Sequence, residues 1–187
     1  MGQIGPGVDV DAAAFVHESA WLYGQVTVGE GSSVWPLVVM RSEMFEIRIG
    51  RNTNIQDHVM IHVGSSTPTI VGDHCSITHH VTLHGCEIGD DCLIGINATV
   101  MDGAKIGSGS IVAGNAIVGE NAEFPANSII AGVPAKRVAE RDCTKPNRFN
   151  ALFYNAIAKR YAQGEDRMDD AAMAALRARF EAEVEAL

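Results

Sequence analysis

The feature that most constrains the fold is an apolar residue at every sixth position across about 120 residues. With three interruptions, these positions are Val10, Val16, Leu22, Val28, Val34, Met40, Ile49, Ile55, Ile61, Val71, Ile77, Leu83, Ile88, Ile94, Val100, Ile106, Val112, Val118, Phe124 and Ile130. A period of six fits neither the 3.6-residue repeat of a helix nor the two-residue repeat of a single strand. Hexapeptide repeats are typical of a parallel β-helix, in which three units make a coil of about 18 residues and coils stack at about 4.8 Å. The repeat therefore predicts an all-β solenoid with inward-facing apolar ladders.

Two further positions of the unit repeat with the apolar one. A small residue lies four positions after the later apolar anchors, at Cys92, Ala98, Ala104, Ser110, Ala116, Ala122 and Ser128. Glycine directly follows many anchors, at Gly29, Gly50, Gly72, Gly89, Gly95, Gly107 and Gly119. These patterns indicate a repeated turn after each short strand.

The repeat ends near Ala135, and the remaining sequence has helical patterning. Pro146 opens one amphipathic segment, Gly164 interrupts the pattern, and Asp169 begins a second one. The apolar stripe of the first segment comprises Phe149, Leu152, Phe153, Ala156, Ile157 and Arg160. We therefore expect a β-helix domain over residues 1–135 and a helical appendage over residues 136–187, packed on the coil or on a neighbouring subunit.

Charge and cysteine usage exclude several classes of partner. Residues 1–135 carry four basic and fourteen acidic side chains, and this acidic coil without a basic stripe argues against nucleic acid and anionic membranes. There is no apolar run of 18 residues or more, and no basic segment followed by an apolar one at the N-terminus. The four cysteines form no CxxC pair. We expect a cytoplasmic protein with reduced, structural cysteines.

Six of the seven histidines lie between residues 58 and 84, and the repeat sets their register. Ile61 and Leu83 are 22 residues apart, which is one coil plus a four-residue insertion that the Gly, Ser and Pro content places in residues 63–68. His62 and His84 each follow an anchor directly, so they should stack on one face, one coil apart. His79 lies two residues past its anchor, on the preceding face.

Three imidazoles can form one metal site only if His79 comes from a neighbouring subunit, for example in a closed threefold ring. Three neutral histidines would leave one tetrahedral position for water, the arrangement of a catalytic zinc site. The alternative is that these are exposed histidines of a polar face that bind nothing. His58 and His80 should also stack, and we interpret them as surface residues.

The sequence closely resembles the γ-class carbonic anhydrase family between residues 10 and 163. The matching segments are Val39-Met40-Arg41-Ser42-Glu43, Ile47-Arg48-Ile49-Gly50, Thr53-Asn54-Ile55-Gln56-Asp57, His62, His79-x4-His84-Gly85-Cys86 and Leu93-Ile94-Gly95. The segment Gly132-Val133-Pro134-Ala135-Lys136 also fits, but hexapeptide acyltransferases share it. The resemblance implies a left-handed β-helix, a homotrimer, and one metal ion at each subunit interface.

The same resemblance implies roles for individual residues. His62, His79 and His84 match the metal ligands, and Gln56, followed by Asp57, matches the side chain that hydrogen-bonds the reacting water. Arg41 matches an interface arginine, and Tyr154 resembles a tyrosine near the metal, although it could simply cover the coil.

Four features depart from the family pattern. The Arg-Gly-Asp motif is Arg41-Ser42-Glu43, Thr78 replaces a glycine, and His80 is additional. The glutamates that serve proton shuttling in some members are replaced by Met44 and Ser65, and residues 165–187 extend beyond short members.

The predicted function is reversible hydration of carbon dioxide to bicarbonate by a hydroxide that a divalent metal generates at the subunit interface. Zinc is the expected metal, with iron(II) or cobalt also compatible with three nitrogen ligands. Two alternatives stay open. One is a metal-binding homologue with little hydratase activity, acting on a CoA thioester or as an assembly subunit. The other is a hexapeptide acyltransferase that uses one histidine as a general base.

Overall fold

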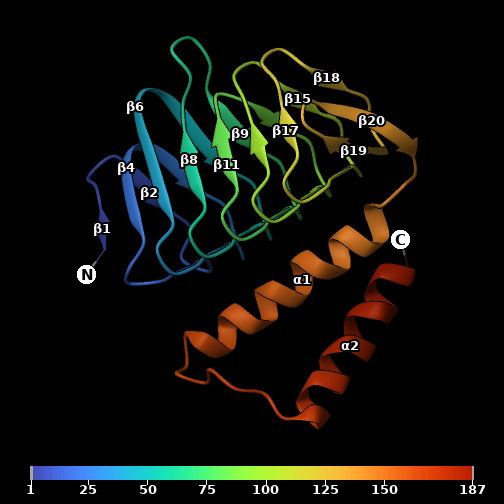
Figure 1. The fold of residues 1–187 in the computed structure, drawn as a ribbon. Coiled ribbons are helices and arrows are strands. Elements are labelled where there is room, and N and C mark those ends of the chain that lie inside the picture. The colour runs from blue at the N-terminus through green and yellow to red at the C-terminus, as the bar shows by residue number, and fades with distance from the viewer. Residues whose placement is uncertain (1, 187) are drawn as a thin grey trace.

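A computed structural model describes residues 2–186. The protein is a left-handed parallel β-helix of about seven coils followed by two helices (Figure 1). The predicted fold class is therefore confirmed. The coil has three faces, which we call A, B and C. Faces A and B belong to one twelve-stranded sheet, because two long strands bend continuously from one face onto the other, and face C is a separate eight-stranded sheet.

The strand bounds follow the repeat. Face A contains β1 (Gln3–Ile4), the first part of β4 (Trp21–Val28), the first part of β6 (Val39–Ile49), β8 (Met60–His62), β11 (Thr82–His84), β14 (Thr99–Val100) and β17 (Ile117–Val118). Face B contains β2 (Val8–Val10), the ends of β4 and β6, β9 (Thr69–Val71), β12 (Glu87–Ile88), β15 (Lys105–Ile106) and β18 (Glu123–Phe124). Face C contains β3 (Phe15–Val16), β5 (Ser33–Val34), β7 (Asn54–Ile55), β10 (Ser76–Ile77), β13 (Leu93–Ile94), β16 (Ile111–Val112), β19 (Ser128–Gly132) and β20 (Ala135–Glu140).

The turns between faces form three edges along the solenoid. The A/B edge contains the bend of β6 and residues 62–68, 84–86 and 101–104. The B/C edge contains residues 29–32, 50–53, 72–75, 89–92 and 107–110. The C/A edge contains residues 35–38, 56–59, 78–81, 95–98 and 113–116.

The core consists of the predicted apolar ladders. Ile55, Ile77 and Ile94 lie in register on neighbouring strands, and each side chain is fully buried. The small residues Cys92 and Ala98 are buried as well, because the chain turns sharply there and leaves no room for a larger side chain. Burial of such stacked aliphatic side chains is the main stabilising term of a repeat fold.

The turns hold residues in the left-handed conformation. On the B/C edge these include Asn52, His74 and Asp91, and on the C/A edge they include His58 and His80. Asparagine, aspartate and histidine are the side chains that most readily adopt positive φ after glycine. The rings of His58 and His80 stack 4.8 Å apart, as predicted, with an interplanar angle of 7°.

The predicted register is confirmed at the histidine coils. Ile61 pairs with Leu83 and His62 with His84, so the extra residues are looped out between β8 and β9. The strand structure extends past the expected domain boundary at residue 135. Strand β20 begins there and pairs antiparallel with β19 as far as Glu140.

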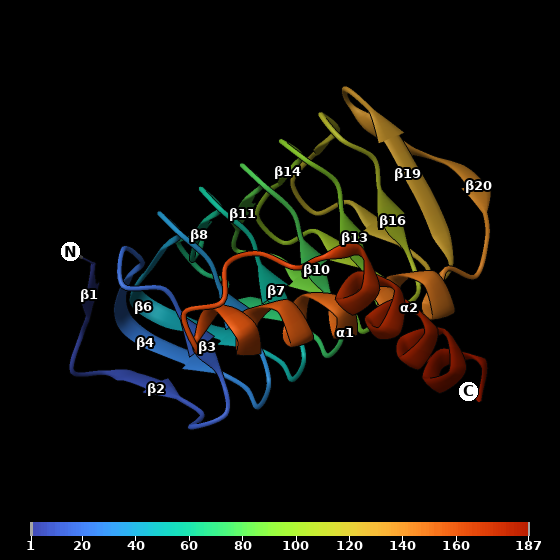
Figure 2. The same cartoon turned by 90° about the horizontal axis from the view of Figure 1, so that it is seen from below.

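Two helices follow, α1 (Thr144–Tyr161) and α2 (Asp170–Glu185). As predicted, Asp169 begins the second helix: its side chain caps α2 by accepting a hydrogen bond from the Ala172 backbone nitrogen at 2.8 Å. Helix α1 runs along the length of the solenoid (Figures 1 and 2) and contacts β5, β7 and β10 on face C. Neither helix is long and apolar enough to cross a membrane, considering the residues that the structure describes.

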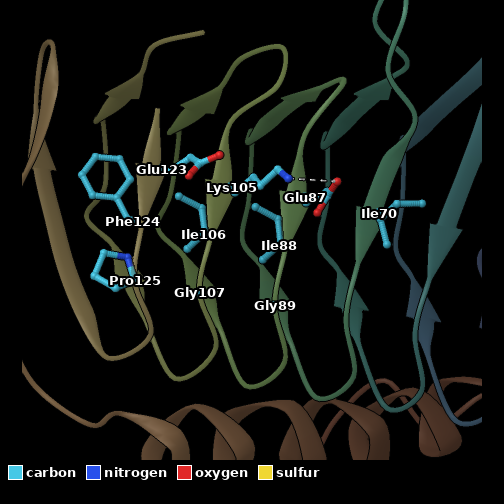
Figure 3. Close-up of a pocket in the computed structure, with 10 residues that line it drawn as sticks. All are labelled: Ile70, Glu87, Ile88, Gly89, Lys105, Ile106, Gly107, Glu123, Phe124 and Pro125. Atoms are coloured by element: carbon cyan, nitrogen blue, oxygen red, sulfur yellow. Dashed lines mark ion pairs between the residues drawn. The ribbon is translucent and has the colours of Figure 1, made fainter. Parts of the chain in front are cut away.

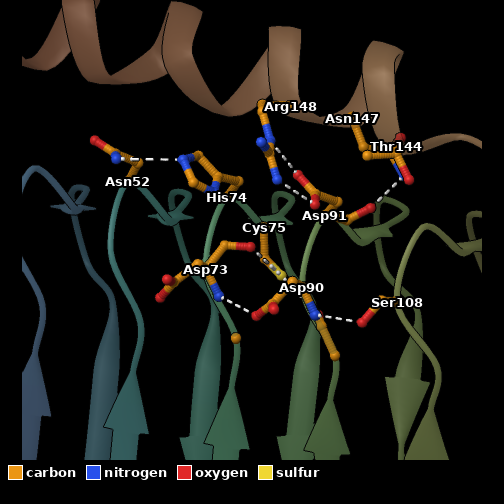
Figure 4. Close-up of polar contacts among 12 residues, drawn as sticks. Asn52, Asp73, His74, Cys75, Asp90, Asp91, Ser108, Thr144, Asn147 and Arg148 are labelled. Carbon is orange, nitrogen blue, oxygen red and sulfur yellow. Dashed lines mark hydrogen bonds and ion pairs between the residues drawn. The ribbon is translucent and has the colours of Figure 1, made fainter. Parts of the chain in front are cut away.

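The face of α1 that meets the solenoid is not the predicted apolar stripe. The buried side chains of the helix are Asn147, Ala151, Asn155 and Ala158. Asn147 donates to the backbone oxygens of Asp91 and Ser110, at 2.8 and 3.1 Å, because turn carbonyls of the B/C edge point at the helix. Arg148 adds a bidentate ion pair with Asp91 at 2.7 and 2.6 Å (Figure 4). Polar turns therefore select a polar, small-residue docking face.

The apolar stripe of α1 packs elsewhere. Leu152 and Ala156 line a small cavity between the helices together with Phe180 of α2. Ile157 lines a second one with Met173 of α2. The stripe thus contacts the second helix. The periodicity of α1 predicts an apolar face, but it does not tell whether that face packs on the coil or on α2.

Candidate metal site

The predicted site residues fall into two groups at opposite edges of face A. Arg41, His62 and His84 lie where face A meets the A/B edge. Gln56, Asp57 and His79 belong to the C/A edge, and Tyr154 comes from α1. We call these sets the A/B group and the C/A group. Within one chain, the structure brings together the members of each group but not the two groups.

His62 and His84 form a pair in the A/B group. They are directly opposite each other on β8 and β11, with ring centroids 5.0 Å apart and an interplanar angle of 51°. His62 Nδ1 and His84 Nε2 face each other at 3.0 Å. Two nitrogens bound to one tetrahedral zinc ion at about 2.0–2.1 Å lie roughly 3.3 Å apart, so the pair is close to the spacing of two ligands of one metal ion.

A carboxylate holds the far side of each of these rings. His84 Nδ1 donates to Asp102 Oδ1 at 2.7 Å, and His62 Nε2 donates to Glu43 Oε2 at 2.9 Å. Because the other nitrogen of each ring donates to a carboxylate, the two facing nitrogens are the ones left to bind a cation between them. Carboxylates that orient ligand histidines in this way are a regular feature of metal sites.

His79 also lies beside a carboxylate, at the other edge. Its Nδ1 lies 3.1 Å from Asp57 Oδ2, and its side chain is 38% exposed. The remaining nitrogen, Nε2, is the one available to a ligand. Each of the three predicted ligands therefore has one ring nitrogen tied to its own carboxylate.

Gln56 is buried beneath α1, with 2% of its surface exposed. Its Nε2 donates to Asn54 Oδ1 at 2.9 Å. The amide is thus held by a neighbouring buried amide on the same strand end rather than by solvent.

Tyr154 joins the C/A group through its packing. Its ring contacts Trp35 edge-on, with centroids 5.8 Å apart and an angle of 87°. Burial raises the pKa of the Tyr154 hydroxyl, and the negative charge of Asp57 raises it further. The phenol therefore stays protonated near neutral pH and can act as a hydrogen-bond donor beside Asp57.

Arg41 pairs with Glu43 across the bend of β6. A hydrogen bond from His62, together with the charge of Arg41, holds the pKa of Glu43 below its usual value. The substitution of glutamate for the family's aspartate therefore gives a carboxylate that reaches both Arg41 and His62 of its own chain. Met44 and Ser65, at the positions of the absent shuttle glutamates, are exposed on the same edge.

Two residues of the candidate site were not assigned from the sequence. Asp102 lies 18 residues after His84, one coil further along the same ladder, so the repeat spacing could have indicated it. Asn54 was part of the motif that carries the resemblance, but its contact with Gln56 depends on side-chain conformations that spacing does not give.

The donor set fits a divalent metal, but one chain does not complete it. Within residues 2–186, no group of three or more His, Cys, Asp or Glu side chains is placed to hold a metal ion. His62 and His84 offer two nitrogens, and a third of the same chemistry lies on the C/A edge. A second copy of the chain would have to supply it.

A surface hollow of about 560 Å³ is not lined by any residue of these groups. It lies on face B, where the exposed side chains of Glu87, Lys105 and Glu123 alternate in charge above Ile88 and Ile106 (Figure 3). Its lining comes from face B and the turns that follow it, and includes none of the histidines.

Known proteins share this architecture and parts of this sequence. The family described as Bacterial transferase hexapeptide (six repeats) matches residues 85–120. Gamma carbonic anhydrase 1, mitochondrial, of Arabidopsis thaliana is 42% identical over 99 residues, covering 50% of this chain and 36% of that protein. The carnitine operon protein CaiE of Escherichia coli O157:H7 is 43% identical over 93 residues, covering 50% of this chain and 47% of that protein. The chain thus spans less than half of the length of either curated relative.

A solved structure matches over a greater length. It is a Bacillus cereus protein for which acetyltransferase activity is suggested, with a TM-score of 0.80 and 31% identity over 82% of this chain and 91% of that one. The repeat, the coil and these similarities agree. The chain belongs to the hexapeptide-repeat family of which the γ-class carbonic anhydrases are members.

Proposed function

We propose that the protein is a metal-dependent carbonic anhydrase whose site forms between the A/B group of one copy and the C/A group of another. The observation that carries the proposal is the tethering of all three histidines. Each has one ring nitrogen beside a carboxylate oxygen, at 2.7–3.1 Å, and the other left for a ligand. Surface histidines without a function have no need of three separate carboxylate partners.

The surface of face A supports assembly with a second copy. Its outward side chains carry no charge before the histidine positions: Trp21, Val39, Met60, Thr82, Thr99 and Ile117. On face B, the equivalent positions include Arg48, Glu87, Lys105 and Glu123, and face C is covered by α1. An uncharged face with one half of the site at each side suits a closed homotrimer, in which every interface completes one site.

A divalent cation held by three imidazoles lowers the pKa of water toward neutrality, which is the chemistry that hydration of carbon dioxide requires. Gln56 would orient the attacking water, because its Nε2 is occupied by Asn54 and its Oε1 is free to accept a hydrogen bond. The Tyr154 hydroxyl can donate to an oxygen of carbon dioxide or of bicarbonate. Glu43, bound to Arg41 and His62, is not free to carry the proton away.

Zinc is the expected metal, and iron(II) or cobalt would fit the same nitrogen donors. A reducing compartment such as the cytoplasm fits the four cysteines, which are all buried free thiols. Burial raises the pKa of Cys86 to about 12, so this thiol is inert in the fold.

The test combines metal analysis with stopped-flow hydration of carbon dioxide on one preparation. We expect one metal ion per chain and hydration that disappears when the metal is removed and returns on reloading. The matched variants are His84→Ala, which should lose both metal and activity, and His58→Ala, which should keep both. A metal-loaded wild type that does not hydrate carbon dioxide would contradict the proposal.

A second candidate is a metal-binding homologue or an acyltransferase of the same family. It is supported by the similarity to CaiE and to the Bacillus cereus protein, which is as extensive as the similarity to the carbonic anhydrase. Acetyl-CoA turnover on the same preparation distinguishes it. An acyltransferase should retain its turnover after metal removal, whereas a metal-dependent thioester hydrolase should lose it.

A further inference from the structure

A chain of hydrogen bonds connects Gln56 to helix α1. Gln56 Nε2 donates to Asn54 Oδ1, Asn54 Nδ2 donates to Ser76 Oγ, and Ser76 Oγ donates to Asn150 Oδ1 of α1, each at 2.9 Å. Gln56, Asn54 and Ser76 are exposed by 2% or less. Because these three side chains have almost no contact with bulk water, the amide and hydroxyl groups that join them depend on one another for their partners.

A backbone carbonyl helps to set the donor-to-acceptor direction of these hydrogen bonds. Asn54 Nδ2 also donates to the backbone oxygen of Cys75 at 3.3 Å, and a carbonyl oxygen can only accept. This contact favours the orientation in which Asn54 turns its Oδ1 toward Gln56 and accepts from the Gln56 NH₂ group. The Gln56 Oε1 is then the atom left for the reacting water.

At the α1 end of this series of hydrogen bonds, Asn150 determines where the Ser76 hydroxyl proton points. The single proton of the Ser76 hydroxyl points at Asn150 Oδ1, which leaves the Ser76 lone pairs free to accept from Asn54. If residue 150 offered no acceptor, that proton would turn toward Asn54 Nδ2 and oppose its donation. The longer Cys75 contact would then hold the Asn54 amide alone, so the acceptor supplied by α1 reinforces the orientation of Gln56.

We propose that Ser76 and Asn150 are positioning residues that set the amide orientation of Gln56 from helix α1. Asn150 and Tyr154 lie four residues apart on one side of the helix, so the docking of α1 delivers both the acceptor for this chain and the phenol of the C/A group. The docked helix is therefore part of the site rather than a cover for the coil. The rate consequence, but not the orientation itself, rests on the proposed hydratase function.

The orientation is measured directly in the metal-free protein. Selective ¹⁵N labelling of glutamine gives side-chain amide signals from Gln3, Gln25, Gln56 and Gln163, and the variant Gln56→Glu assigns the signal of interest. Ser76→Ala and Asn150→Leu should shift or broaden the Gln56 amide pair. Asn150→Asp keeps an acceptor oxygen of the same size and should preserve the wild-type signal.

The second readout is hydration by the metal-loaded variants. Ser76→Ala and Asn150→Leu should lower kcat about tenfold or more at unchanged metal content, with Asn150→Asp close to wild type. An unmoved Gln56 signal in both Ser76→Ala and Asn150→Leu would overturn the inference, as would an Asn150→Asp protein that behaves like Asn150→Leu. Shifted signals in a protein without hydratase activity would instead overturn the proposed function and leave the inference standing.

Discussion

The two edges that carry the candidate site are built in different ways. On the C/A edge, Gln56 and its partner Asn54 are almost fully buried under α1, and their hydrogen bonds are satisfied within the chain. On the A/B edge, Glu43 is 49% exposed and His62 and His84 are 21% and 32% exposed. One half is fixed by the fold, and the other half consists of partly exposed side chains held by carboxylates.

The difference separates two tasks. Orientation of a reacting water requires a rigid amide, because catalysis depends on donors and acceptors that do not reorganise. Metal capture requires neutral imidazoles that each keep one ring nitrogen for the ion, and partial exposure lets the ion reach them. We expect substitutions on the A/B edge to act first on metal content, and substitutions on the C/A edge other than at His79 to act on rate.

The largest expected effect, on metal binding and hydration, comes from removing one ligand histidine from either the A/B group or the C/A group. His84→Ala and His79→Ala should each abolish metal binding and hydration. Random mixing of the two variants by unfolding and reassembly should restore about one quarter of the sites, since each site takes one edge from each of two copies in a closed ring.

The measurement is hydration per chain after mixing, with unmixed variants treated identically as the control. Restoration is possible only if the ligands come from different copies. Mixed proteins as inactive as their parents, despite forming oligomers, would show that one chain supplies the whole site.

The next largest effect concerns rate without metal loss. Gln56→Ala should keep the metal and lower kcat about 10- to 100-fold, because it removes a group that acts on the water and not on the ion. Elemental analysis and stopped-flow kinetics on the same sample check this expectation. Loss of the metal together with the rate would instead identify Gln56 as a determinant of metal affinity.

Asp102→Asn should have a smaller effect, on metal affinity. The amide keeps the shape of the side chain but removes the negative charge that polarises His84 through Nδ1. We expect affinity to fall about tenfold, as is typical for the partners of ligand histidines. Competition with a chelator measures it, and Glu87→Gln on face B, whose carboxylate lies 4.0 Å from Lys105, is the control.

The smallest expected effect is on the pH dependence of stability, and it concerns His74, a turn residue near Arg148 of α1. Partial burial, followed by the positive charge of Arg148, lowers the pKa of His74. Its ring contacts Asn52 (Figure 4), and the charges of Asp91, Asp73 and Arg51 on the B/C edge also act on it.

Because the folded-state pKa lies below the unfolded value of about 6.5, the unfolded chain binds more protons as pH falls through that value, and stability is lost. His74→Asn, a residue that suits the same backbone conformation, should flatten the fall in urea midpoint between about pH 7.5 and 5.5. His58→Asn, exposed in an equivalent turn, should not change it. Equal pH slopes in wild type and His74→Asn would remove His74 from this role.

Much of the fold could be predicted, because a hexapeptide period leaves few alternatives. The pairing of His62 with His84 followed from counting residues between Ile61 and Leu83. The contacts made by α1 could not be predicted in this way. Its helical periodicity identified an apolar stripe, whereas the solenoid turns present carbonyl oxygens that select Asn147 and Asn155.

The candidate site, too, could be predicted from the sequence only in part. Residue types and register suggested the three histidines and their separation between two faces. The carboxylates that hold them, such as Asp102, depend on rotamers, and the chain of amides from Gln56 to Asn150 depends on how a distant helix docks. Strand β20 was also missed, because an antiparallel pair at the end of the solenoid has no hexapeptide pattern.

The exposed tip of the loop at residues 63–68, Ser65 and Ser66, can vary without disturbing the histidine pair, whereas Gly64 packs against Asp102. Strands β8 and β11 stay paired on one side of it while the extra residues project outward between β8 and β9. Ladder spacing, and not loop length, therefore fixes the distance between His62 and His84. Evolution or a designer could lengthen or recharge this exposed tip to alter access to the site while the spacing of the two imidazoles stays constant.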